Sequence, residues 1–130
     1  MIIIDASAMT EALVGQHRDD ELLDALEGDI ATPHILDLEV ISALRGLNRG
    51  SKLEPASAQD ALTHLLDLNI IRWNTEPLVE RIWSLRHQFT SYDASYLALA
   101  EIVDAPLYTC DAKLDTDGHA ATVRVFPRSI

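Results

Sequence analysis

The chain has 130 residues, of which 48% are apolar and 24% charged, as in one compact globular domain. Its net charge of −11 argues against broad nucleic-acid binding through Lys and Arg, although an enzyme that meets phosphates through bound metal ions stays open. No apolar run reaches the roughly 20 residues of a membrane helix, and the start lacks a signal peptide. The single cysteine cannot form an internal disulfide, so a cytoplasmic location is expected.

Short apolar runs alternate with segments of helical periodicity along the chain. In chain order, the predicted elements are strand 1–5, helices 6–14 and 19–27, a helix that ends near residue 48, helix 55–69, strand 70–73, helices 76–88 and 91–104, strand 107–110, a loop or single turn over 113–121 and strand 123–126. This alternation predicts a single domain over residues 1–130, a three-layer α/β/α sandwich with a mostly parallel central sheet.

Capping residues indicate where three of these helices begin. Thr32 and Pro33 are typical of the N-cap and first position of the helix that ends near residue 48, so that residues 31–32 are either the start of this helix or a brief strand. Thr75 is expected to cap helix 76–88, and Ser91 to cap helix 91–104.

Helix 91–104 places a carboxylate on an apolar stripe. The stripe is formed by Tyr96, Leu97, Ala100 and Val103. Asp93 lies three and four residues before Tyr96 and Leu97, near the middle of that stripe. A carboxylate directed at a core costs several kcal/mol unless it is compensated. The amides of the first helical turn could compensate Asp93 alone, or it could join other acids.

Two further acids follow predicted strands directly. Asp5 ends the first strand and Asp111 follows the strand 107–110. In a parallel sheet the carboxyl ends of the strands open into a common crevice, and helices that return to the sheet start at the same edge. Topology alone therefore predicts that Asp5, Asp93 and Asp111 converge. A fourth acid could be Asp37 or Glu39, which lie some 200° apart on their helix, and periodicity does not choose between them.

Such a cluster needs a cation. Two carboxylates about 4 Å apart repel by roughly 4 kcal/mol at an effective dielectric of 20. Oxygen ligands without His or Cys favour Mg²⁺ or Mn²⁺ over Zn²⁺. These ions activate water and neutralise phosphoryl charge, so the pattern points to phosphodiester hydrolysis.

The acids and their surroundings resemble the acidic quartet of PIN-domain ribonucleases. The quartet comprises Asp5 in MIIIDASA, Glu39 in DLEVISALR, Asp93 in SYDASYLALAE and Asp111 in YTCDAKL. The order, spacing and chain length are most similar to those of VapC toxins from toxin–antitoxin pairs. The family pattern selects Glu39 over Asp37, while Asp115 and Asp117 compete with Asp111 for the fourth position.

The resemblance implies a Mg²⁺-dependent endoribonuclease, with Mn²⁺ as a substitute, that cuts RNA and commonly transfer RNA. Asp5 and Asp93 would hold the metal most directly, Glu39 and Asp111 would complete the site, and Ser7 would support it. It also implies a homodimer and an inhibitory VapB-like antitoxin with a basic segment.

Two other functions fit parts of the pattern. An Asp-dependent phosphatase is one, although it needs a second Asp two residues after the first, where this chain has Ser7. A non-catalytic module whose acidic groove takes a basic peptide is the other, and the net charge of −11 suits it. Cys110 is interpreted as a buried strand thiol, and Trp73, Trp83 and Tyr96 as core or dimer-interface residues. Arg45, Arg49 and Lys52 suit either helix-dipole compensation or RNA-phosphate contact.

Overall fold

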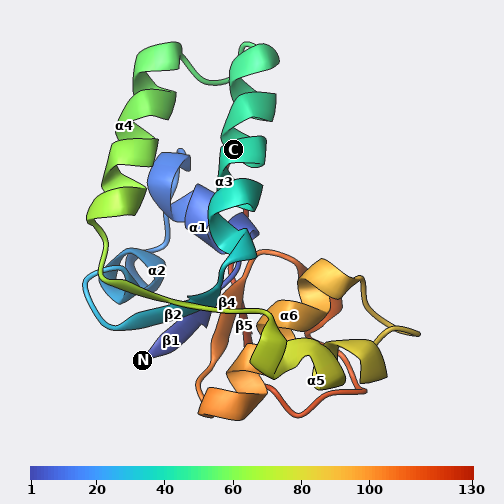
Figure 1. Ribbon diagram of the computed structural model, residues 1–130. Helices are drawn as coiled ribbons and strands as arrows, with labels where there is room; N and C mark the ends of the chain where they lie inside the picture. Colours follow the sequence, from blue (N-terminus) through green and yellow to red (C-terminus); the bar gives the residue numbers. More distant parts are fainter.

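A fully parallel sheet of five strands forms the centre of the computed structural model, which describes residues 1–130 (Figure 1). The strands are β1 (Ile2–Ile4), β2 (Ile30–Pro33), β3 (Ile70–Trp73), β4 (Leu107–Thr109) and β5 (Val123–Val125). Their order across the sheet is β3-β2-β1-β4-β5, so the first strand of the chain lies in the middle.

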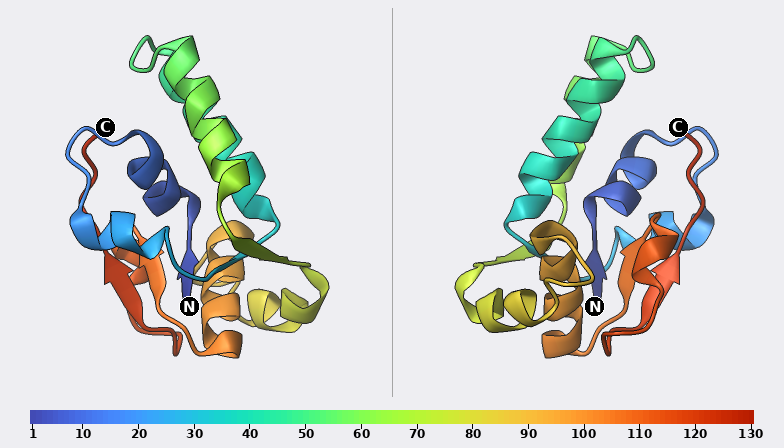
Figure 2. Two further views of the ribbon diagram at one scale, coloured as in Figure 1. Left: turned by 90° about the vertical axis from the view of Figure 1, so that its left-hand side faces the viewer. Right: turned by 90° about the vertical axis from the view of Figure 1, so that its right-hand side faces the viewer.

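Helices cover both faces of the sheet, which confirms the predicted α/β sandwich. They are α1 (Ala6–Val14), α2 (Asp20–Ala25), α3 (Ile35–Arg49), α4 (Pro55–Asp67), α5 (Val79–Ser84) and α6 (Ser91–Val103), with the 3₁₀ turns η1 (Glu76–Leu78) and η2 (Ala112–Leu114). α6 packs on β1, β2 and β4, while α1 packs on β4 and against α3 and α4. Figure 2 shows α3 and α4 rising together above the sheet. No helix combines the length and apolar character needed to cross a bilayer.

The strand order reverses between β1 and β4. From β1 the chain winds outward through β2 to β3, then returns through α5 and α6 to β4 on the other side of β1. In open parallel sheets such a reversal leaves a crevice at the carboxyl ends of the two strands. Asp5 follows β1 and Asp111 stands two residues after the end of β4, so both acids lie at this crevice.

The predicted start of the third helix is wrong. Thr32 and Pro33 belong to β2, where Pro33 pairs with Trp73 and the Thr32 hydroxyl donates to the Ile4 carbonyl at 3.3 Å. α3 begins at Ile35 without a side-chain cap. All four residues of β2 are buried, so pairing on both sides of the strand outweighs the local capping preference of the Thr-Pro pair.

Two other helix starts also differ from the prediction. Helix 76–88 is divided into η1 and the six-residue α5, and Thr75 makes no capping hydrogen bond. The N-cap of α6 is Thr90 rather than Ser91, because the Thr90 hydroxyl accepts a hydrogen bond from the Asp93 amide at 3.2 Å. The cap therefore also fixes the backbone of Asp93.

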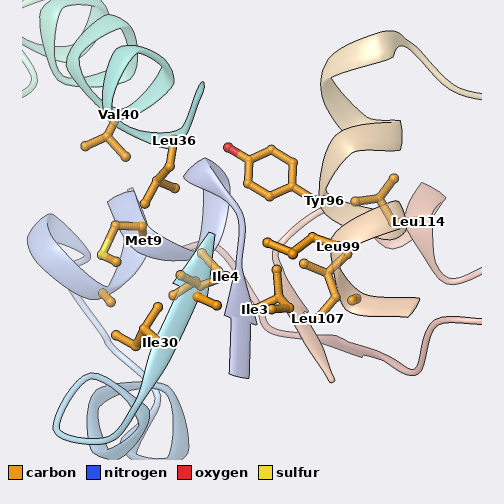
Figure 3. Close-up of a cluster of buried hydrophobic side chains, with 14 of the residues drawn as sticks. Ile3, Ile4, Met9, Ile30, Leu36, Val40, Tyr96, Leu99, Leu107 and Leu114 are labelled. Carbon is orange, nitrogen blue, oxygen red and sulfur yellow. The ribbon is translucent and has the colours of Figure 1, made fainter. Parts of the chain in front are cut away.

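The core fills both sides of the sheet, and on one side it packs against α6 (Figure 3). Every residue of α6 from Ala94 to Ala100 is buried, because small and aliphatic side chains let the helix lie close on the strands. Tyr96 is 1% exposed, as its core assignment predicts, whereas Trp83 is 66% exposed beneath the Arg86 guanidinium and is no core residue. The surrounding core thus holds the start of α6 rigidly.

Candidate metal centre

Asp5 is the buried acid of the site. As N-cap of α1, it accepts hydrogen bonds at Oδ1 from the Ser7 hydroxyl at 2.6 Å and from the Ala8 amide at 3.0 Å. Oδ2 accepts a hydrogen bond from the Thr109 hydroxyl. Burial raises the pKa of Asp5, the hydrogen bonds from Ser7, Thr109 and Ala8 oppose that rise, and the charge of Asp93 adds to it.

Thr109 is a site residue that the sequence analysis missed. Its hydroxyl contacts Asp5, lies 3.3 Å from the Ser7 hydroxyl and accepts a hydrogen bond from the Asp111 amide at 3.0 Å. The Ser7 hydroxyl also accepts a hydrogen bond from the Cys110 amide at 2.8 Å. Two hydroxyls therefore tie the end of β4 to the start of α1. A threonine at the end of a buried strand carries no sequence signal that separates this role from simple strand propensity.

The structure separates Asp37 from Glu39. Asp37 forms a bidentate ion pair with Arg72 of β3, with nitrogen–oxygen distances of 2.7 and 3.0 Å. Glu39 lies on the other side of α3 and accepts a hydrogen bond from the Tyr96 hydroxyl at 2.6 Å. Only Glu39 therefore faces the crevice. Burial raises the pKa of Glu39, the Tyr96 hydrogen bond opposes the rise, and the charges of Asp93 and Asp5 add to it.

Tyr96 links α6 to α3 through this hydrogen bond. Figure 3 shows its ring lying over the core with the hydroxyl pointing away from α6. Burial, the hydrogen bond to Glu39 and the negative charge of Glu39 raise the pKa of Tyr96 far above its usual range, so the hydroxyl remains a donor. The core assignment of Tyr96 is confirmed, but its position on the site was not predicted.

Asp93 lies at the start of α6, half-buried. Burial raises its pKa most, the charge of Asp111 raises it further, and the charge of Lys113 opposes both. Asp111 accepts a hydrogen bond from the Lys113 amide at 3.0 Å and has the Lys113 ammonium 3.8 Å from Oδ2. The carboxylates of Asp115 and Asp117 are exposed and have no ion pair, and Asp111 is the acid whose charge acts on Asp93.

Asp5, Glu39 and Asp93 form a cluster of like charge, and the nearby Lys113 ammonium pairs with Asp111 instead of with any of these three. None of the three has an ion pair. The charge of Asp93 raises the pKa of Asp5, and the charges of Asp93 and Asp5 raise the pKa of Glu39. No group of three or more His, Cys, Asp or Glu side chains has the arrangement of a ready-made metal cage. Mg²⁺ binds through one or two carboxylates and keeps several waters. Facing carboxylates that form no ion pair therefore fit this ion and not a closed structural site.

Comparisons with known proteins agree with the fold. The PIN-domain family model matches residues 2–116. Ribonuclease VapC9 of Mycobacterium tuberculosis is 37% identical over 129 residues, covering 98% of this chain and all of the relative. The crystal structure of PAE2754 from Pyrobaculum aerophilum superposes with a TM-score of 0.69 at 24% identity, over 92% of this chain and 87% of that chain. A toxin–antitoxin complex from Klebsiella pneumoniae has a TM-score of 0.58 at 19% identity, over 90% and 92% of the two chains.

The fold, the family match and the named ribonuclease relatives together place the chain in the class of nucleases. The chain belongs to the PIN-domain family and, within it, to the VapC-type ribonucleases, the toxins of toxin–antitoxin pairs. The resemblance read from the sequence is therefore confirmed. The assignment of the individual acids to catalysis stays a prediction.

Proposed function

We propose that this protein is a Mg²⁺-dependent endoribonuclease toxin that hydrolyses phosphodiester bonds in cytoplasmic RNA, with transfer RNA as its target. The observation that carries the proposal is the cluster of Asp5, Glu39 and Asp93, three acids that face one crevice and form no ion pair. Their mutual repulsion is relieved by a hard divalent cation.

In this proposal Asp5 and Asp93 hold the ion most directly, and Glu39 and Asp111 complete the site. Bound Mg²⁺ supplies an activated water and neutralises charge on the phosphoryl oxygens. The hydroxyls of Ser7 and Thr109 hold Asp5 in place, so that its carboxylate keeps one orientation.

Glu39 is positioned to move the proton. Tyr96 occupies its Oε1 and leaves Oε2 without a hydrogen bond, and its raised pKa makes it a better base near neutral pH. Glu39 takes a proton from the attacking water, the water oxygen bonds to phosphorus, the bond to the 3′ oxygen breaks, and the released 3′ oxygen takes up a proton from solvent. The products are a 5′-phosphate and a 3′-hydroxyl.

The same cluster supports an antitoxin partner. An acidic crevice attracts the Arg or Lys of a basic segment, which would occupy the site and exclude RNA. The fold neighbour from Klebsiella pneumoniae is a toxin–antitoxin complex. We include a homodimer in the proposal because it is general to the family.

Substitution of the clustered acids tests the proposal. Asp5→Asn, Glu39→Gln and Asp93→Asn should each lower RNA cleavage by at least about a hundredfold, more than the loss of a residue that only supports a metal ligand. Asp37→Asn is the matched control on the same helix and should keep cleavage, because Asp37 pairs with Arg72. The measurement is single-turnover cleavage of transfer RNA by the purified protein with Mg²⁺ and with EDTA.

Full activity in the cluster variants, or cleavage that persists in EDTA, would overturn the proposal. Sequencing of the RNA ends identifies the cleaved site and checks for the 5′-phosphate. A calorimetric titration tests the binding module, which would take a basic peptide but no Mg²⁺. A trapping experiment tests the phosphatase, which would leave a phospho-aspartate at Asp5.

A further inference from the structure

A groove continues from the acid cluster along α3. It has a volume of about 470 Å³, and its lining includes Ser7 and Thr10 of α1, Glu39 and Gly46 of α3, and Arg128 from the segment after β5. Figure 2 shows this last segment facing α3 across α1. Because Glu39 belongs to the acid cluster and the Ser7 hydroxyl donates a hydrogen bond to Asp5, the groove and the crevice form one continuous surface.

The groove has polar groups and open space that the fold itself does not use. Thr10 is only 4% exposed. Its hydroxyl oxygen is the one buried side-chain polar atom without a hydrogen-bond partner. A Cβ at Gly46 would meet nothing within 4 Å, so the wall formed by α3 is open at this point. A buried hydroxyl normally finds a partner, and its lack of one here suits a surface that is completed by a ligand.

The segment after β5 is fastened to α1 by a buried carboxylate. Glu11 is 1% exposed and accepts hydrogen bonds from the Ser129 amide at 2.7 Å and from the Ser129 hydroxyl. The Ser129 hydroxyl in turn accepts a hydrogen bond from the His17 amide at 2.9 Å. Ser129 is thus held from two sides, and its neighbour Arg128 is directed over the groove.

Arg128 is the only basic side chain among the lining residues. It is exposed and forms no ion pair, although Glu39 also lines the groove. An unpaired guanidinium beside an acidic site is suited to an anionic ligand, and phosphate matches its bidentate geometry.

We propose that Arg128, positioned by the contact between Glu11 and Ser129, binds an RNA phosphate that neighbours the scissile one. The site rests on the proposed ribonuclease function, because Arg128 would bind the same RNA strand where that strand leaves the acid cluster. A basic segment of an antitoxin would be repelled at this point, so the chemistry of the groove favours RNA over that partner. A phosphate contact holds the strand in register but reads no base sequence.

RNA binding by a non-cleaving variant tests the site. In an Asp93→Asn background, the affinity for a short labelled single-stranded RNA is measured across a salt series with Mg²⁺ present. Arg128→Ala should weaken binding by about tenfold and make the slope of log K against log salt shallower by about 0.7, the value for one phosphate on a single strand. Arg86→Ala removes the same charge at a distance, where Arg86 stacks on Trp83, and should leave both values unchanged.

Ser129→Ala separates positioning from charge. It keeps Arg128 but removes the hydroxyl bonds to Glu11 and His17, so it should weaken RNA binding in part. Combined with Arg128→Ala, it should add no further loss, because both changes act through one contact.

An unchanged salt slope in Arg128→Ala would overturn the site even if the wild-type protein cleaves RNA. Conversely, a wild-type protein that fails to cleave, with binding that still depends on Arg128, would overturn the ribonuclease proposal and leave the phosphate site standing. Equal loss in Arg86→Ala would show that only net charge matters and would also refute the site.

Discussion

Asp93 carries a charge that opposes folding in the absence of a cation. Its pKa is raised above the ordinary value of 3.8 by burial and by the charge of Asp111. A carboxyl whose pKa is higher in the folded state than in the unfolded state stabilises the fold at a pH below its ordinary pKa. This stabilisation is lost as the pH rises through the pKa of the folded state. At neutral pH the ionised Asp93 therefore destabilises the metal-free fold.

Replacement of Asp93 by Asn should therefore raise the stability of the metal-free protein while it removes activity. In EDTA near pH 7 we expect the Tm of Asp93→Asn to exceed that of the wild type by a few degrees. The difference should shrink as the pH falls and Asp93 takes up a proton. Thermal unfolding by circular dichroism at several pH values measures it, and a lower Tm in the variant at neutral pH would contradict this account.

The residues differ in how far the sequence could place them. Asp5, Asp93 and Asp111 were brought together by strand topology alone, and the crevice between β1 and β4 is where the structure has them. Glu39 could be chosen only by resemblance, because the ion pair of Asp37 with Arg72 depends on a strand that lies 35 residues further along the chain. Arg128 gave no signal at all, since its position follows from a long-range contact.

The end of α1 depends on a close approach. A Cβ at Gly15 would meet Glu11 Oε2 and would lie 2.5 Å from the Glu11 main-chain oxygen. Gly15 is therefore needed at this position because the buried Glu11 carboxylate turns back over the C-cap toward Ser129.

Gly15→Ala should displace the Glu11 carboxylate and lower the free energy of unfolding by about 1–3 kcal/mol, the usual range for overpacking. Gly28→Ala is the matched control, since its nearest contact is the Ala25 carbonyl oxygen at an ordinary 3.7 Å. Urea unfolding measures both variants. Equal stabilities of the two variants would mean that the Glu11 carboxylate does not need the space that Gly15 leaves.

Elements with a clear period were predicted well, and those set by their neighbours were not. The range 6–14 agrees with α1, and 70–73 agrees with β3, because each is marked by its own pattern. β2 was ambiguous because its buried residues have no alternation, and only pairing with β1 and β3 makes it a strand. The division of helix 76–88 into η1 and α5 likewise follows from how the segment packs against α6.

For the whole molecule, the fold and the acid cluster are coupled through the cation. A ligand that binds only the folded state stabilises it by about 1.4 kcal/mol at a tenfold excess over Kd. Mg²⁺ should therefore raise the Tm of the wild type near neutral pH, and the effect should disappear in acid as Asp5, Glu39 and Asp93 take up protons.

The same titration in variants shows whether the effect comes from the cluster. Asp37→Asn should keep the Mg²⁺-dependent rise in Tm, and Asp93→Asn should lose most of it. A NaCl series of matched ionic strength is the control for general screening of the −11 charge. A rise of equal size in NaCl would remove the support for a specific cation site.

The central position of β1 also bears on when this enzyme first becomes active. Asp5 emerges early from the ribosome, yet the Thr109 hydroxyl that fixes it is 104 residues away and stands on β4, one of the last strands to be made. Parallel pairing over such a separation is slow and requires both strands. A nascent chain therefore carries a bare carboxylate and no assembled site until β4 has been made, so the ribosome that makes the toxin is not exposed to a functional nuclease before synthesis has passed Asp111.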